Sequence, residues 1–275
     1  MPKDRARKAY ADTPFGQVHY RSAGPADGPA LLLIHWTPLS GRMYAALLPL
    51  LAERGFRVIA PDLLGYGRSD PRPETWSIAA WADSLLALLD GLGIGDAVVL
   101  GGHVGACVAV EIALAQPERV RRLILDGCPL PTPELRAAFA SMKAQARPQA
   151  APDGAHERLA FQAAAGLLKH YTPSFTLEGA GLERVWPAMI DYLETDFVSS
   201  APISGAYDLG ERLPLVTTPL LLMGAATDTL AGSFDAARAL APAARTAWFE
   251  GDHPIHDPAE AEAYISAWSA FAAEG

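Results

Sequence analysis

The residue with the clearest chemical potential is His103, which stands between Gly101 and Gly105 in a glycine-flanked stretch. A neutral imidazole is already a nucleophile, and it can also act as a general base toward water or a substrate proton. Small residues two positions to either side let a strand and a helix approach closely around a central residue in strained backbone. The sequence therefore predicts a reactive imidazole at a tight corner of the chain.

The residues on either side of His103 predict the secondary-structure elements that position it. The apolar, β-branched run 98–100 is typical of a buried strand, and the Ala- and Val-rich segment after the corner has helical spacing. That segment ends at Gln116 and Pro117, because proline interrupts a helix. A strand, a tight turn and a helix form the expected frame of the site.

This frame resembles the nucleophile elbow of the α/β-hydrolase family, whose pattern is G-x-S-x-G. Histidine stands here in place of the serine. Family members commonly end the next helix with a phrase similar to Pro-Glu-Arg-Val, found here at residues 117–120. In the family the nucleophile lies about 14 residues before that proline, which selects His103. The competing register would leave the apolar Val104 at the elbow.

The resemblance implies further site residues. In the family an acid and then a histidine follow the nucleophile in chain order, and they correspond here to Asp228 and His253. Asp126 is the reserve acid, because some families place the acid after the strand that follows the elbow. His256 is a weaker alternate for the histidine.

The resemblance also implies an oxyanion hole and a pocket wall. The backbone N–H groups of Thr37 and Val104 are the expected oxyanion donors. The family has glycine where this chain has Trp36, so this indole is expected to occlude the hole or to form a pocket wall. Trp186 is a second pocket candidate, and His35 is expected to be a structural, hydrogen-bonded histidine.

Two imidazoles within hydrogen-bond reach resist holding two positive charges, because like charges disfavour the doubly protonated pair. We therefore expect His103 and His253 to share one proton, with Asp228 orienting His253 and stabilising its cation. Such a pair suits proton exchange with a substrate.

Strand and helix patterns alternate along most of the chain, with strands expected near 17–21, 30–34, 56–60, 98–100, 122–126, 219–224 and 246–249 and a terminal helix over 259–271. Ala-rich helical segments take over near 134–146, 155–169 and 181–195, which resembles the family's helical cap. The prediction is an α/β-hydrolase fold with a mostly parallel sheet covered by helices on both faces. Residues 1–130 and 215–275 form the expected core, and 131–214 form the inserted helical cap.

Composition narrows the classes of partner. A chain of 275 residues with a net charge of −9 would be repelled by nucleic acid and by anionic membranes. The resemblance to the α/β-hydrolase family implies a small-molecule substrate. No signal peptide or membrane span is visible, and two cysteines give no disulfide framework, so we expect a cytoplasmic monomer or homodimer. No strong metal-ligand motif or nucleotide fingerprint is present, so no metal or cofactor is expected.

Three functions remain open at this point. The first is a hydrolase of an ester, lactone or thioester-like carbonyl compound, with His103 as nucleophile or base. The second is a lyase, cyclase, decarboxylase or isomerase that uses His103 and His253 as general acid and base. The third is a non-catalytic ligand-binding member, or a variant in which histidine was introduced into a serine or aspartate enzyme. Fold alone does not choose among them.

Overall fold

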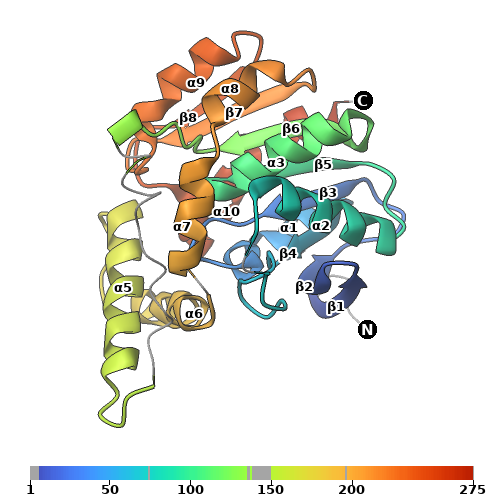
Figure 1. The fold of residues 1–275 in the computed structure, drawn as a ribbon. Coiled ribbons are helices and arrows are strands. Elements are labelled where there is room, and N and C mark those ends of the chain that lie inside the picture. The colour runs from blue at the N-terminus through green and yellow to red at the C-terminus, as the bar shows by residue number, and fades with distance from the viewer. Residues whose placement is uncertain (1–5, 74, 135–136, 138–149, 196, 275) are drawn as a thin grey trace.

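The computed structural model describes residues 6–73, 75–134, 137, 150–195 and 197–274 (Figure 1). Its centre is an eight-stranded sheet in the order β1-β2-β4-β3-β5-β6-β7-β8. β2 pairs antiparallel with β1 and β4, and the other neighbours are parallel. The strands are β1 (Arg7–Thr13), β2 (Gly16–Ala23), β3 (Ala30–Ile34), β4 (Arg57–Pro61), β5 (Ala97–Gly102), β6 (Val120–Asp126), β7 (Leu220–Ala225) and β8 (Arg245–Phe249).

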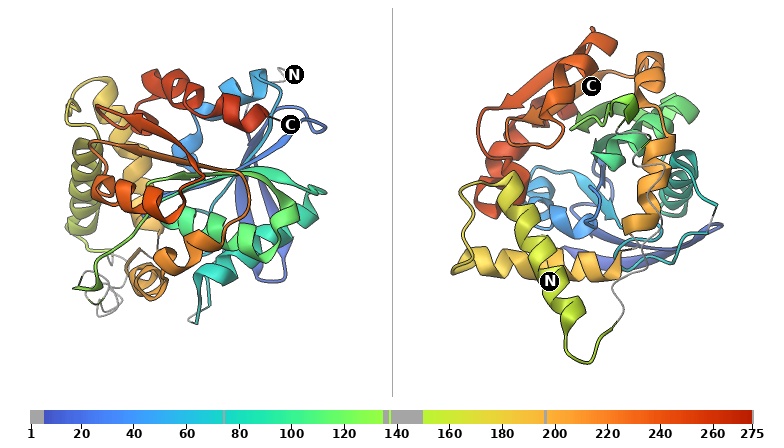
Figure 2. Two further views of the ribbon diagram at one scale, coloured as in Figure 1. Left: turned by 90° about the horizontal axis from the view of Figure 1, so that it is seen from above. Right: turned by 60° about the vertical axis from the view of Figure 1, so that its left-hand side comes forward.

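Helices cover both faces of this sheet (Figure 2). On one face α2 (Ile78–Gly91) and α3 (Val104–Ala115) share an apolar core with alternate strand residues such as Leu32 and Val99. On the other face α1 (Leu47–Glu53), α10 (Ala261–Ser266) and α11 (Ser269–Ala273) pack against Leu31 and Leu33. Successive strand residues point to opposite faces, so continuous apolar runs supply both cores. The predicted fold class is confirmed.

Helices also fill the chain between β6 and β7, where the sequence predicts a cap. They are α5 (Ala155–Tyr171), α6 (Ala180–Glu194), α7 (Phe197–Ala206) and α8 (Leu209–Arg212). α5 and α6 pack around a separate apolar cluster that includes Phe175 and Val185 and also Leu39 from the segment after β3. The expected helix at 134–146 lies almost entirely outside the described residues. A cap role for this segment stays a prediction.

Some elements differ from the sequence expectation. The polar strand β1 is an exposed antiparallel edge, and such a strand needs no continuous apolar run to signal it. The terminal helix is broken at Ala267 and Trp268 into α10 and α11. The described residues also form short helices: η1 (Gly41–Tyr44), η2 (Pro117–Arg119), η3 (Leu213–Leu215), η4 (Ala231–Ser233), α9 (Phe234–Leu240), η5 (Pro254–His256) and η6 (Pro258–Glu260). Within the described ranges, no helix combines the length and apolar character needed to cross a membrane.

Candidate active site

His103 lies at the corner between β5 and α3 in strained backbone. Its φ is 52° and its ψ is −117°, and among the described residues it is the one non-glycine residue with positive φ. Such a conformation costs free energy and persists where the surroundings fix it. The His103 N–H donates to the carbonyl oxygens of Asp126 and Gly127, each at 3.1 Å. The end of β6 thus holds the corner in place.

The flanking glycines are required by close backbone contacts. A methyl group on Gly101 would lie 2.1 Å from the carbonyl oxygen of Gly105, and one on Gly105 would lie 2.5 Å from the carbonyl oxygen of Ile34. These distances are far inside van der Waals contact, so only glycine lets β5, β3 and α3 meet here. The sequence-based argument about small residues around His103 is confirmed.

The His103 imidazole pairs with a carboxylate that follows β7. Nε2 of His103 lies 3.1 Å from Oδ2 of Asp228, while Oδ1 accepts from the N–H of Leu230 at 2.7 Å and the hydroxyl of Thr229 at 3.3 Å. Burial raises the pKa of Asp228, but the hydrogen bond and charge of His103 and the Leu230 N–H outweigh it and leave that pKa below its ordinary value. Asp228 is therefore ionised at neutral pH.

An ionised carboxylate only accepts hydrogen bonds, so Nε2 of neutral His103 must carry the proton toward Asp228. The lone pair then resides on Nδ1. No described residue hydrogen-bonds Nδ1, and the His103 side chain is 11% exposed. The corner between β5 and α3 thus presents an imidazole that is oriented by Asp228 at Nε2 and has no described hydrogen-bond partner at Nδ1.

Gly127 makes room for this pair. Its φ is +74°, and a methyl group there would lie 2.8 Å from Cδ2 of His103 and 2.9 Å from Oδ2 of Asp228. A side chain at this position would push into the hydrogen bond between the two residues. Sequence reasoning did not identify Gly127 as a site residue, although a glycine directly after a buried strand-end aspartate is a usable signal.

The second histidine, His253, makes its own pair with the reserve acid. Nε2 of His253 lies 3.1 Å from Oδ1 of Asp126, and the hydroxyl of Tyr264 donates to Oδ2 at 2.7 Å. The N–H of Ile255 donates to Nδ1 of His253 at 3.3 Å. His253, Asp126 and Tyr264 are fully buried. Both ring nitrogens of His253 are thus engaged inside the protein.

The expected pairing of the site residues is therefore wrong. Asp228 hydrogen-bonds His103 instead of His253, and Asp126 takes His253; within the described part of the chain, no hydrogen bond joins the two imidazoles. The indole of Trp36 contacts both rings, with its centroid 4.0 Å from that of His103 and 4.9 Å from that of His253. The bulky residue at the family's glycine position fills the space through which the histidines would meet.

The other predicted positions have mixed outcomes. Val104 is the first residue of α3, where a backbone N–H has no intrahelical acceptor, and the Thr37 hydroxyl lies 3.0 Å from that of Tyr66. Their oxyanion role stays a prediction. Trp186 is 62% exposed, and its neighbour Val185 lies on the buried side of α6. A pocket role of Trp186 stays a prediction.

The remaining histidines near the site also differ in role. His35 is structural as expected: Nδ1 lies 2.9 Å from the carbonyl oxygen of Trp36, and Nε2 accepts from the N–H of Leu63 at 3.0 Å. Burial lowers the pKa of His35, which keeps the ring neutral. The side chain of His256 lies outside the described residues. No group of three His, Cys, Asp or Glu side chains that could hold a metal is present in the part of the chain that the structure describes.

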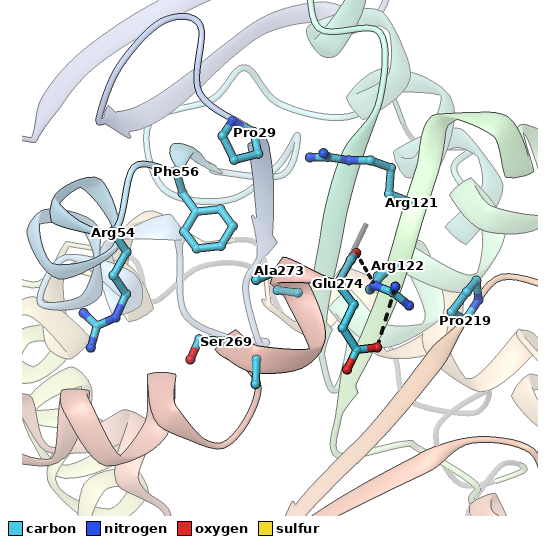
Figure 3. A pocket seen from close by; sticks show the side chains of 11 residues that line it. Pro29, Arg54, Phe56, Arg121, Arg122, Pro219, Ser269, Ala273 and Glu274 are labelled. Atoms are coloured by element: carbon cyan, nitrogen blue, oxygen red, sulfur yellow. Dashed lines mark hydrogen bonds and ion pairs between the residues drawn. The ribbon is translucent and has the colours of Figure 1, made fainter.

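A hollow of about 770 Å³ lies at the opposite end of the sheet, near the amino ends of β3, β4, β6 and β7 (Figure 3). Its arginines are already balanced by carboxylates: Arg54 pairs with Glu262, Arg121 with Asp96, and Arg122 with Glu274. Each of these described arginines has a carboxylate partner, whereas His103 and Asp228 follow the carboxyl ends of their strands, where α/β sheets place their ligands.

Comparison with known proteins supports the fold. A family model described as alpha/beta hydrolase fold matches residues 29–160, which include His103 and Asp126 and stop short of Asp228. A haloalkane dehalogenase from Mycolicibacterium paratuberculosis is 36% identical over 140 residues, or 50% of this chain and 46% of that protein. Lipase LipV from Mycobacterium tuberculosis is 40% identical over 108 residues, or 39% of this chain and 40% of that protein. The chain thus spans less than half the length of these relatives.

A solved structure extends the comparison to the whole chain. A hydrolase from Pseudomonas aeruginosa PA01 superposes with a TM-score of 0.76 at 26% identity, and the match covers 98% of this chain and 99% of that one. The similarity therefore includes the segments after residue 160 that carry Asp228 and His253.

Proposed function

We propose that this chain, which has the α/β-hydrolase fold, hydrolyses a small carbonyl compound and that His103 and Asp228 carry the reaction. The observation that carries the proposal is the oriented imidazole at the elbow, with Nε2 on Asp228 and Nδ1 without a hydrogen bond from any described residue. The comparison with proteins named as a lipase, a dehalogenase and a hydrolase supports this class of reaction.

In this proposal His103 acts as a general base. Nδ1 takes a proton from water, and the O–H electron pair lets the water oxygen bond to the substrate carbonyl carbon. The imidazolium that results is stabilised by Asp228 at Nε2. The proton on Nδ1 then passes to the leaving oxygen or sulfur as its bond to carbon breaks. Positioned base catalysis of this type contributes about 10²–10⁴-fold in rate.

The backbone N–H groups of Thr37 and Val104 are proposed to stabilise the oxyanion formed during attack. The Val104 N–H belongs to the first turn of α3, and a helix N-terminus favours negative charge. His253 is proposed to anchor the site, because Asp126 and the N–H of Ile255 occupy both of its ring nitrogens. The substrate is proposed to be a small molecule, which the similarity to a haloalkane dehalogenase supports, and a net charge of −9 would repel polyanionic partners.

A second candidate is a lyase or isomerase reaction in which His103 moves a proton on the substrate itself. The observation that favours it is that a histidine–aspartate pair suffices for proton transfer, without a serine or carboxylate nucleophile at the elbow. Nδ1 of His103 accepts the proton in both candidate reactions, so mutation of His103 does not distinguish them. The reaction product does, because only hydrolysis adds water to the substrate.

The proposal is tested by turnover of 4-nitrophenyl acetate and δ-valerolactone in water enriched in ¹⁸O. We expect one labelled oxygen in each acid product and loss of turnover in His103→Ala. Wild-type protein that releases no acid from either substrate would contradict hydrolysis and favour the proton-transfer reaction. Hydrolysis at the wild-type rate by His103→Ala would overturn the role of the elbow histidine.

A phosphonate probe and an acyl trap separate the base from a nucleophile. We expect no stoichiometric phosphonate adduct on the wild-type protein, because the elbow carries no serine. Rapid quench and mass spectrometry should find no acyl group on His103 during turnover. An acyl-imidazole that forms and decays at the catalytic rate would assign His103 as the nucleophile and contradict the general-base step.

A further inference from the structure

We propose that Trp36 is a positioning residue of the His103–Asp228 pair, and that its indole face stabilises the positive charge formed on His103 when Nδ1 accepts a proton. This inference rests on the proposed function and deepens it. It assigns an electrostatic role to the residue that stands where the family has glycine.

The geometry of the two rings carries the inference. The indole and imidazole centroids are 4.0 Å apart and the ring planes are inclined by 16°, so the rings are stacked face to face. A cation within about 6 Å of an aromatic centroid and over its face is attracted by the ring quadrupole, and indole gives the strongest effect. The ring of His253 meets the same indole at 82°, which is an edge-on contact. The face of the Trp36 indole is therefore stacked on the ring of His103 and not on that of His253.

Packing fixes the indole in this position. Trp36 is 1% exposed, and a methyl group on Gly102 would lie 1.6 Å from its Nε1, so the indole rests directly on the backbone of β5. The backbone N–H of Trp36 donates to Sδ of Met43 at 3.4 Å, and the ring of Tyr171 packs against the indole at 5.3 Å. The indole cannot turn away from His103 without disrupting these contacts.

The charge balance of the reaction gives this stack its function. Before the proton transfer the pair holds a neutral imidazole and the carboxylate of Asp228; afterwards it holds an imidazolium and the same carboxylate. Asp228 stabilises the cation in the plane of the ring at Nε2, and Trp36 lies over the ring face. In a buried site such interactions are stronger than in water, so the indole lowers the barrier to proton transfer.

Site-specific incorporation of fluorinated tryptophans at position 36 tests this directly. Each added fluorine withdraws electron density from the indole face and leaves the shape of the side chain nearly unchanged. With 4-nitrophenyl acetate at saturation, we expect kcat to fall stepwise and to be about tenfold lower with tetrafluorotryptophan. KM and the unfolding midpoint should stay within error.

The matched control is the same series at Trp81. This residue is also fully buried, its Nε1 donates to the carbonyl oxygen of Leu64, and its ring packs against Tyr66 away from His103. We expect no change in kcat there. Two ordinary substitutions at position 36 complement the fluorinated series. Trp36→Phe keeps an aromatic face and should retain more turnover than Trp36→Leu.

The outcomes separate this inference from the proposed function. A flat kcat across the series at position 36, with His103→Ala inactive, would overturn the role of Trp36 and leave the His103 reaction intact. Full activity of His103→Ala would overturn the proposed function and this inference together. An equal decline in the Trp81 series would show a general effect of fluorination and would also overturn the inference.

Discussion

Two of the histidine–aspartate pairs among the described residues, His103–Asp228 and His253–Asp126, have the same Nε2-to-carboxylate distance of 3.1 Å and different surroundings. In the first pair, His103 stands at a strained corner with Nδ1 available, and part of its side chain reaches the surface. In the second, His253 is fully buried, its Nδ1 accepts from Ile255, and Asp126 also binds Tyr264.

The comparison teaches that residue type and spacing do not assign a histidine its role. A buried imidazole with both nitrogens satisfied stabilises the fold, because each of its hydrogen bonds replaces one that water would otherwise make. An imidazole held at one nitrogen and left without a partner at the other can exchange a proton with a ligand. The first pair is therefore suited to chemistry and the second to holding β6, the His253 loop and α10 together.

The largest expected difference between the pairs is in stability. Asp126→Ala removes the acceptor of two buried donors, so we expect the free energy of unfolding to fall by about 3–5 kcal/mol. Asp228→Ala should cost about half as much, because Leu230 and Thr229 lie closer to solvent. Urea unfolding of both variants checks this order. Equal losses would show that the second pair is not the structural one.

A smaller effect is expected from crowding the first pair. Gly127→Ala must adopt positive φ and presses on both His103 and Asp228, so we expect a loss of about 2–3 kcal/mol in stability and a clear fall in turnover. Gly93→Ala is the matched control, because Gly93 also has positive φ but has no atom within 4 Å of the added methyl group. Unchanged turnover in Gly127→Ala would refute the tight fit of the pair.

The hydroxyl groups at the two pairs should also differ. Tyr264→Phe leaves Oδ2 of buried Asp126 without its donor and is expected to cost about 1–3 kcal/mol in stability with little effect on kcat. Tyr171→Phe removes only the hydroxyl that lies 3.2 Å from Thr229 and should cost less than about 1 kcal/mol. Thermal unfolding and steady-state kinetics of the two variants test this contrast, which a larger loss in Tyr171→Phe would reverse.

The smallest effect is in the pH dependence of stability. The pKa of Asp228 is lower in the folded protein than its ordinary value of 3.8. The ionised carboxylate therefore contributes fully to the free energy of unfolding above pH 3.8, and this contribution is lost as the pH falls through the lowered pKa. The stability difference between the wild type and Asp228→Asn should therefore shrink on acidification below pH 3.8. Urea unfolding of both proteins between neutral and acidic pH measures this stability difference. A difference that grows on acidification would contradict the stabilising contact between Asp228 and His103.

Much of this arrangement could be predicted from the sequence. Continuous apolar runs indicated the parallel strands, and the glycines around His103 indicated the corner, because both signals are local. The carboxylates and histidines of the site were also identified, with Asp126 held in reserve.

The partners of these residues could not be predicted in the same way. Which carboxylate meets which imidazole depends on how β6, β7 and the His253 loop converge, and on the volume that Trp36 occupies between the rings. The exposure of Trp186 depends on which side of α6 packs inward, and its neighbours Val185 and Ala188 take that side. These outcomes are set by tertiary packing, which periodicity along one chain does not encode.

His103 is proposed to perform the chemistry and His253 to hold the fold. The most direct measurement is kcat, normalised to folded protein, for His103→Gln and His253→Gln with the same probe ester. We expect about a 10²–10⁴-fold loss for His103→Gln with near wild-type stability, and a destabilised but active His253→Gln. A His253→Gln protein that folds normally and has lost turnover, beside an active His103→Gln, would contradict the account.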